Sequence, residues 1–175
     1  MRSFLKGLLI TAAFAGLAGE AWAQASATQS TTGTGTILQP LTLTKNTDLA
    51  FGTIVRASSG SNTVVVNETT GARTLTGGGN SALVTSTTSR ATYTVNGEGA
   101  QTFSITVPAS FNMTRSGGSE TLAVTLVSTA ASGTLSGSLG SAGSATFGVG
   151  GSFPLDNTAV AGSYSGTFNV TVAYN

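Results

Sequence analysis

The amino-acid sequence predicts an all-β fold, an antiparallel sandwich or barrel. After residue 23 the chain consists mainly of Thr, Ser, Gly, Val and Ala, and only 7% of its 175 residues are charged. Apolar and polar residues alternate over short stretches rich in Val and Thr, which suits pleated strands. Turn signals recur about every ten residues, so roughly eight to ten short strands are expected. No helical periodicity competes with this interpretation.

The first 23 residues have the features of a secretory signal peptide. Arg2 and Lys6 precede an apolar run, LLITAAFAGLAG, that is too short to span a bilayer comfortably. The small residues around Trp22, in Ala-Trp-Ala, form a cleavage site. We therefore expect export, cleavage after Ala23 and a mature chain that starts at Gln24. No second long apolar run follows, so no membrane span is expected in the mature chain.

The charges of the mature chain argue against several classes of partner. Lys45, Arg56, Arg73, Arg90 and Arg115 balance Asp48, Glu68, Glu98, Glu120 and Asp156. A net charge of zero without clusters argues against nucleic acid and against a polybasic membrane patch. The chain has no Cys, so a core of about 150 residues must hold without disulfides, which is feasible at this size.

The residue inventory also argues against catalysis. Without His or Cys, neither a Ser-His or Cys-His pair nor a zinc site of the usual kind can form. Gly148, Gly150 and Gly151 lie between strand residues and open no helix, so they do not indicate a nucleotide site. The five carboxylates are scattered among turn residues, which favours solvated charges over a glycosidase pair. We expect a non-enzymatic protein with no cofactor and no metal site.

The first half of the mature chain contains an arm and several short strands. Residues 24–36, QASATQSTTGTGT, are small and polar and predict a flexible or extended arm. In the strand that follows, Leu41 and Leu43 share one face, and Pro40 limits this strand to an edge or a bulge. Further short strands are expected in DLAFGTIV, in TVVVN, and about Leu75 and Leu83.

The second half contains the clearest alternation. RATYTVNG and QTFSITVP flank a GEG turn and predict a β-hairpin over residues 90–107. ETLAVTLVST and ATFGVGGSFPL predict two more strands, with a loose loop or weak edge strand between them. The residues expected in the core are Phe51, Tyr93, Phe103, Phe111, Phe147 and Phe153. A last strand is expected to start at Gly162 and run almost to the end.

The last strand carries a resemblance. Phe168, Val170 and Val172 alternate, Tyr174 is penultimate, and Gly162 is the fourteenth residue from the end. This ending resembles that of fimbrial subunits of the chaperone–usher kind. The resemblance implies an immunoglobulin-like antiparallel β-sandwich that lacks its final strand. A periplasmic chaperone and then the arm of the next subunit would supply the missing strand by edge pairing.

The two ends of the domain also resemble members of two families. ILQPLTLTKNTDLAFGTIV and GTFNVTVAYN look like the two ends of the domain-of-unknown-function family 4402. The Leu-x-Phe-Gly element at Leu49, Phe51 and Gly52 resembles spore-coat-U-like fimbrial subunits. The resemblance implies a bacterial surface subunit that polymerises through strand donation. Its partners would be other copies, a periplasmic chaperone and an outer-membrane usher, in the periplasm and then at the cell surface or outside it.

The resemblance assigns the interface to the two ends of the mature chain. The arm, residues 24–36, would be the donor, ahead of a sandwich domain over 37–175; alternatively, the donor would include residues 37–43. The inward-facing donor positions would be Ala25, Ala27, Gln29, Thr31 and Gly33. The acceptor groove would be lined by Gly162, Gly166, Phe168, Val170, Val172 and Tyr174, together with the Leu41–Phe51 region. The alternative is a monomeric secreted adhesin or carbohydrate-binding sandwich, whose sheet would be closed and whose arm would be dispensable.

Overall fold

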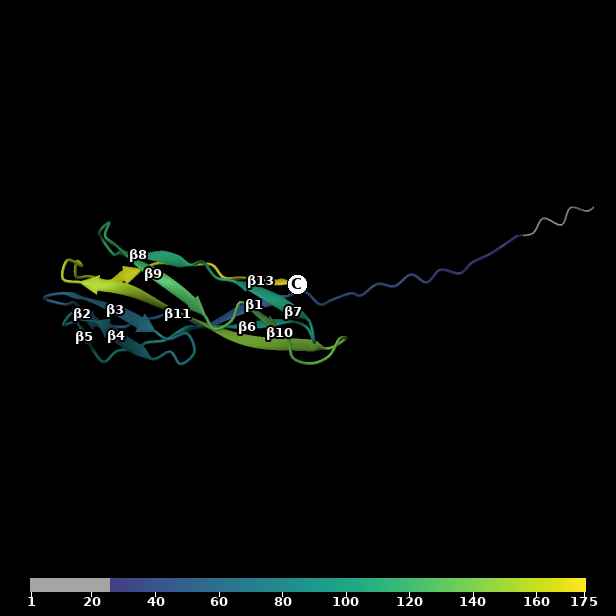
Figure 1. The fold of residues 1–175 in the computed structure, drawn as a ribbon, viewed down its shortest axis with the longest axis horizontal. Coiled ribbons are helices and arrows are strands. Elements are labelled where there is room, and N and C mark those ends of the chain that lie inside the picture. Colours follow the sequence, from purple (N-terminus) through teal and green to yellow (C-terminus); the bar gives the residue numbers. More distant parts are fainter. Residues whose placement is uncertain (1–25) are drawn as a thin grey trace, which may run out of the picture. The chain divides into compact units, whose positions relative to one another are not determined.

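All regular elements in the computed structural model, which describes residues 26–175, are β-strands in antiparallel pairs (Figure 1). The all-β prediction is therefore confirmed. The predicted signal peptide, with Gln24 and Ala25, lies outside the described residues. Residues 26–35 are exposed and form no strand, and residues 36–175 form the body of the fold. Within the described range no helix has the length and apolar character needed to cross a membrane.

The described part of the chain contains thirteen strands. They are β1 (Thr42–Thr47), β2 (Ile54–Val55), β3 (Ser61–Val66), β4 (Arg73–Gly77), β5 (Ala82–Leu83), β6 (Ala91–Glu98), β7 (Thr102–Thr106), β8 (Ser110–Arg115), β9 (Thr121–Ser128), β10 (Ser132–Thr134), β11 (Ala142–Asp156), β12 (Tyr164–Ser165) and β13 (Thr171–Tyr174).

Eight of these strands form one sheet that curls into a half-barrel. Its strand order is β1-β6-β11-β9-β8-β12, and β3 joins β11 as a branch that continues to β4. The 15-residue β11 holds the sheet together, because it pairs with β6 along Ala142–Val149 and with β3 along Gly151–Asp156. A shorter ladder joins β11 to β9. Figure 1 shows β11 running from the β6 region of the body to the β3 region.

Two smaller sheets complete the body, one with the order β10-β7-β13 and one formed by β2 and β5. A single apolar core cluster includes side chains from both β6 and β7. Tyr93 stacks on Phe147 with ring centroids 5.1 Å apart, and Phe51 meets Phe153 edge to face at 4.9 Å. Phe103 is only 1% exposed. Of the six aromatic residues expected in the core, five are buried, and Phe111 is half-buried.

The predicted hairpin over residues 90–107 is wrong. Both strands exist, but β6 pairs with β1 and β11 in the large sheet, whereas β7 pairs with β10 and β13 in another. The segment between them, with Ala100 at a φ of 60°, carries the chain from one sheet to the other. Tyr93 and Val95 on β6, and Phe103 and Ile105 on β7, are buried in the same core. Alternation fixes which face is apolar, and that face is the same whether two strands pair or pack across a core.

Close backbone approach explains the glycines inside β11. At Gly150 a Cβ atom would lie 2.3 Å from the carbonyl oxygen of Val66 and 2.5 Å from the nitrogen of Glu68. At Gly148 it would lie 2.5 Å from the carbonyl oxygen of Glu68. The chain that leaves β3 therefore crosses β11 where β11 has no side chains. These glycines therefore allow close packing of the main chain.

Candidate functional site

The last segment of the chain, Tyr164 to Tyr174, has one open edge. β12 pairs with β8, and β13 pairs with β7, but neither has a second partner within residues 26–175. Between them, residues 166–170 make no main-chain hydrogen bond to any described residue. Unpaired main-chain N–H and C=O groups are strong hydrogen-bonding sites. The segment therefore has unpaired main-chain groups along one edge, and in residues 166–170 on both edges.

The edge strand β1 forms the opposite rim of a groove. β1 pairs with β6 alone, so the large sheet ends at β1 on one side and at β12 on the other. Half-buried apolar side chains lie along this groove and pack against the core. They are Leu41, Leu43, Leu49, Phe111, Met113, Leu122, Phe168, Val170, Val172 and Tyr174. An apolar groove between two unpaired strand edges is a site where an extended chain can add as a strand.

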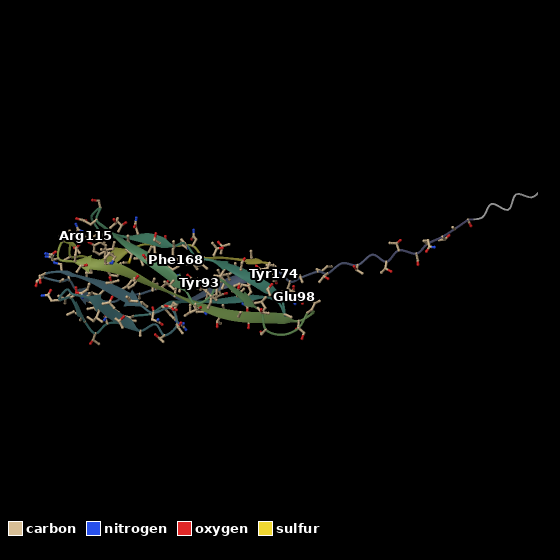
Figure 2. All side chains as sticks on the ribbon, viewed as in Figure 1. Tyr93, Glu98, Arg115, Phe168 and Tyr174 are labelled. Atoms are coloured by element: carbon tan, nitrogen blue, oxygen red, sulfur yellow. The ribbon has the colours of Figure 1, made fainter. Side chains whose placement is uncertain are left out.

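Two adjoining clefts extend the groove away from β13. The larger has a volume of about 600 Å³ and lies between residues 49–56 and residues 159–164. The smaller, about 270 Å³, lies between Lys45–Leu49 and residues 164–168, above Phe111. Leu49, Met113 and Tyr164 line both clefts, so the two lie side by side. Figure 2 shows Tyr174 and Glu98 toward one end of the body, Phe168 between them and Arg115, and Arg115 toward the other end.

The penultimate tyrosine joins the end of β13 to the residues just before β1. The Tyr174 hydroxyl accepts a hydrogen bond from the Glu98 main-chain N–H at 2.7 Å and donates one to the Gln39 carbonyl at 2.8 Å. Gly97 leaves room for this hydroxyl, since a Cβ there would lie 2.3 Å from it. The Glu98 side chain, only 3% exposed, accepts hydrogen bonds from the main-chain N–H groups of Gln39 and Gly140. This network fixes the point where the chain enters the domain against the end of β13.

We expect Tyr174→Phe to destabilise the domain by about 1–3 kcal/mol. The substitution keeps the ring but leaves the Glu98 N–H without its acceptor, and burying an unsatisfied polar group costs this much. Thermal unfolding of the two proteins measures the difference. Tyr164→Phe is the matched control, because the hydroxyl of Tyr164 bonds only to the exposed Val160 carbonyl. Equal losses in the two variants would contradict the role given to Tyr174.

The charged groups along the groove are paired with one another or with main-chain atoms. Lys45 forms an ion pair with Asp48, and the hydrogen bond and attraction of this pair raise the pKa of Lys45. Arg115 bonds to Glu120 at 2.7 Å, which lowers the pKa of that carboxyl. Arg56 donates to the Ala159 carbonyl at 2.7 Å. Burial raises the pKa of Tyr93, which lines the smaller cleft. The groove is thus suited to an uncharged segment.

The residues expected to form the acceptor groove do not all have the same surroundings. Phe168, Val170, Val172 and Tyr174 are half-buried along the open segment, and Phe168 packs on Phe111 with ring centroids 5.0 Å apart. Gly166 faces β8, where a Cβ would lie 2.3 Å from the Asn112 carbonyl oxygen. Gly162 lines the larger cleft. In the arm, Ala27, Gln29, Thr31 and Gly33 are exposed and unpaired with any strand, and Ala25 is not described.

Sequence reasoning missed the strand that supplies the floor of the groove. β8 was not predicted, and its Phe111 and Met113 line the clefts together with Leu122 of β9. The signal was present, since Phe111 and Met113 alternate with polar residues in SFNMTR. Among residues 26–175 no group of three or more acidic, His or Cys side chains is placed to hold a metal ion.

Comparison with known proteins gives one family. The model of the family described as Domain of unknown function (DUF4402) matches residues 41–174, which covers β1 through Tyr174. No curated protein and no solved structure matches the chain.

Proposed function

We propose that this chain, which belongs to the DUF4402 family, is a structural subunit of a bacterial surface fimbria that assembles by donor-strand complementation. The arm of one copy, residues 24–36, adds as a strand to the groove of another. One observation carries the proposal: both rims of an apolar groove are unpaired strand edges, and residues 166–170 of one rim make no main-chain hydrogen bond to any described residue.

Strand addition would both pair the open main-chain edge of this groove and cover its apolar side chains. Main-chain hydrogen bonds from the incoming strand pair the open edge, and its alternate side chains cover the half-buried apolar residues. An open edge beside apolar surface otherwise favours aggregation, so an exported protein benefits from a partner that covers it during transit. A periplasmic chaperone is the proposed first occupant, and an outer-membrane usher is the proposed site of exchange for the arm.

The proposal includes the architecture and location of the subunit. The eight-stranded sheet and the β10-β7-β13 sheet, which share one core, are proposed to be the two layers of an immunoglobulin-like sandwich with one strand position unfilled. The protein is exported through its signal peptide and acts at the cell surface or outside it. Its role is mechanical and non-enzymatic.

Deletion of residues 24–36 tests the donor role. Strand-paired polymers resist SDS without heating and separate into monomers on boiling, so the full chain, co-expressed with a chaperone, is expected to give a ladder in unheated gels and fibres in electron micrographs. The deleted chain is expected to give soluble monomer only. A ladder that survives the deletion would refute the proposal.

A matched pair of substitutions separates groove contacts from a general effect of charge. Thr31 belongs to the inward-facing set of the arm, and Thr32 is its outward neighbour. Thr31→Asp should remove the ladder because it buries an unpaired charge, while Thr32→Asp should leave it intact.

The alternative, a monomeric carbohydrate-binding module, draws support from the larger cleft. Its volume of about 600 Å³ lies in the range of small-ligand sites. A single monomer band in unheated and heated gels, without fibres, together with binding on a glycan array, would favour this alternative over the fimbrial subunit.

A further inference from the structure

Ile37 is the most exposed of the large apolar side chains in the described residues, at 95%. Two residues later the main chain is fixed, since both the N–H and the C=O of Gln39 are hydrogen-bonded, to Glu98 and Tyr174 respectively. A scattered exposed apolar residue needs no explanation by itself. Ile37, however, is held at the junction of the proposed donor and the domain, and it is the only large apolar residue between positions 26 and 37.

We propose that Ile37 of one copy fills the larger cleft of the next copy and sets the register of the added strand. This inference rests on the proposed function and deepens it, because it names the residue that anchors the donor and the pocket that receives it. The occupant is a second copy of this chain.

The direction of the added strand follows from the two rims. Gln39, just before β1, lies against Tyr174 at the end of β13, while residues 49–54 lie across the larger cleft from residues 159–164. β1 and the last segment therefore run in opposite directions. All the strand pairs within residues 26–175 are antiparallel, and we give the donor the same relation to the last segment, which makes it parallel to β1 on the other rim. Such a donor starts beside Tyr174 and ends beside Tyr164, at the larger cleft.

The register of that donor can be counted. With Ile37 opposite Tyr164, Ala27 is opposite Tyr174, so the segment from Ala27 to Ile37 spans the whole open edge. Directly opposed residues of an antiparallel pair point to the same face. The residues that share the face of Tyr174, Val172, Val170 and Phe168 are then Ala27, Gln29, Thr31, Gly33, Gly35 and Ile37.

Side-chain size agrees with this register. Gly33 lies opposite Phe168, and Gly35 lies opposite Gly166, and both Phe168 and Gly166 line the smaller cleft. Small donor residues thus meet the smaller cleft. The single large donor residue meets the larger cleft, whose apolar lining includes Phe51, Ile54 and Leu122. Residues 26–37 carry no charge, which suits a groove whose charged groups are already paired.

The geometry predicts a head-to-tail polymer. The end of the domain with Gln39 and Tyr174 in one copy contacts the end with the larger cleft in the next, and the same contact repeats. A parallel donor would instead bring Ile37 to the Tyr174 end of its neighbour. Two identical ends would then meet, which gives closed pairs rather than a growing chain.

Disulfide trapping tests the register in the full-length protein. The sequence has no Cys, so introduced thiols are the only ones present. The double variant Ile37→Cys with Val160→Cys places one thiol at the anchor and one in the lining of the larger cleft. We expect it to form oxidised oligomers larger than dimers that survive boiling and separate on reduction. The control double variant, Ile37→Cys with Val172→Cys, places the second thiol at the other end of the groove and should not form them.

The outcomes separate this inference from the proposed function. A wild-type ladder in unheated gels, with trapping only through Val172→Cys or through neither pair, would overturn the role of Ile37 and leave strand donation intact. Absence of any wild-type ladder would overturn both.

A second variant measures the contribution of the anchor without cysteines. Ile37→Ser should make the unheated polymers dissociate about ten-fold faster or more, because burial of one Ile side chain accounts for at least this factor. Val127→Ser removes an apolar side chain that is 49% exposed on β9 and should leave the rate unchanged. Equal rates for Ile37→Ser and the wild type would overturn the anchor role.

Discussion

A second copy of residues 26–37, joined after Asn175 through a four-residue turn rich in Gly and Asn, is expected to abolish polymerisation and yield a stable monomer. In the proposed register Ala27 pairs with Tyr174, so the added segment needs only a hairpin turn to enter the groove of its own chain. The segment would complete the open edge from Tyr174 to Tyr164 and exclude the arm of any other copy.

The expected gain in stability follows from the burial of the added Ile side chain, about 2 kcal/mol. For a domain of this size that corresponds to a rise in Tm of roughly 4–8 °C. Size-exclusion chromatography and thermal unfolding measure the two effects. The matched control carries Asp in place of the added Ile. Compared with the Ile fusion, it should still form some polymer and unfold at a lower temperature. A fusion that polymerises like the wild type would contradict the proposed direction of the donor.

Gly150→Ala is expected to cost about 3 kcal/mol or more of the free energy of unfolding, which lowers Tm by roughly 6–12 °C. The added Cβ would lie 2.3 Å from the Val66 carbonyl oxygen and 2.8 Å from the Glu68 Cα. Both are main-chain atoms, so relief requires movement of β3 or of β11. Because β11 pairs with β3, β6 and β9, such movement disturbs three ladders at once.

Gly78→Ala is the control for Gly150→Ala. A Cβ at Gly78 would meet no atom within 4 Å, and its backbone does not have a positive φ. Its effect should stay within about 0.5 kcal/mol of zero. Chemical denaturation of both variants measures the difference. A similar, small effect at the two positions would show that β11 and the end of β3 can move apart without a loss of stability.

The strands rich in Val and Thr could be predicted because their signal is local. β3, β4, β5, β6, β7, β9 and β11 all lie where alternation or a short apolar run placed them. The partners of these strands could not be predicted. Tyr93 and Phe103 were correctly placed in the core, but the same alternation is compatible with a hairpin and with two facing sheets. The pairing of β6 with β11, some fifty residues away, decides between them.

Both rims of the candidate site could be predicted from the sequence, but not its floor. Phe168 to Tyr174 carried a periodic pattern that identified the last segment, and Leu41 and Leu43 identified β1. The network of Tyr174 with Glu98 and Gln39 depends on contacts over 76 and 135 residues, which local sequence patterns do not reveal. The sequence left open whether the donor ends at residue 36 or includes residues 37–43, and β1 begins only at Thr42.

The position of β11 also determines when the domain can fold. Its partners β3, β6 and β9 precede it in the sequence, and β11 itself ends at Asp156. In the export that we propose, the N-terminus crosses the membrane first, so the pairing strands arrive before the strand that joins them. Loop closure over such separations is slow, and edges exposed meanwhile are prone to misassociation. Under the proposed export, we therefore expect this domain to fold only after β11 has crossed, with the preceding strands exposed until then.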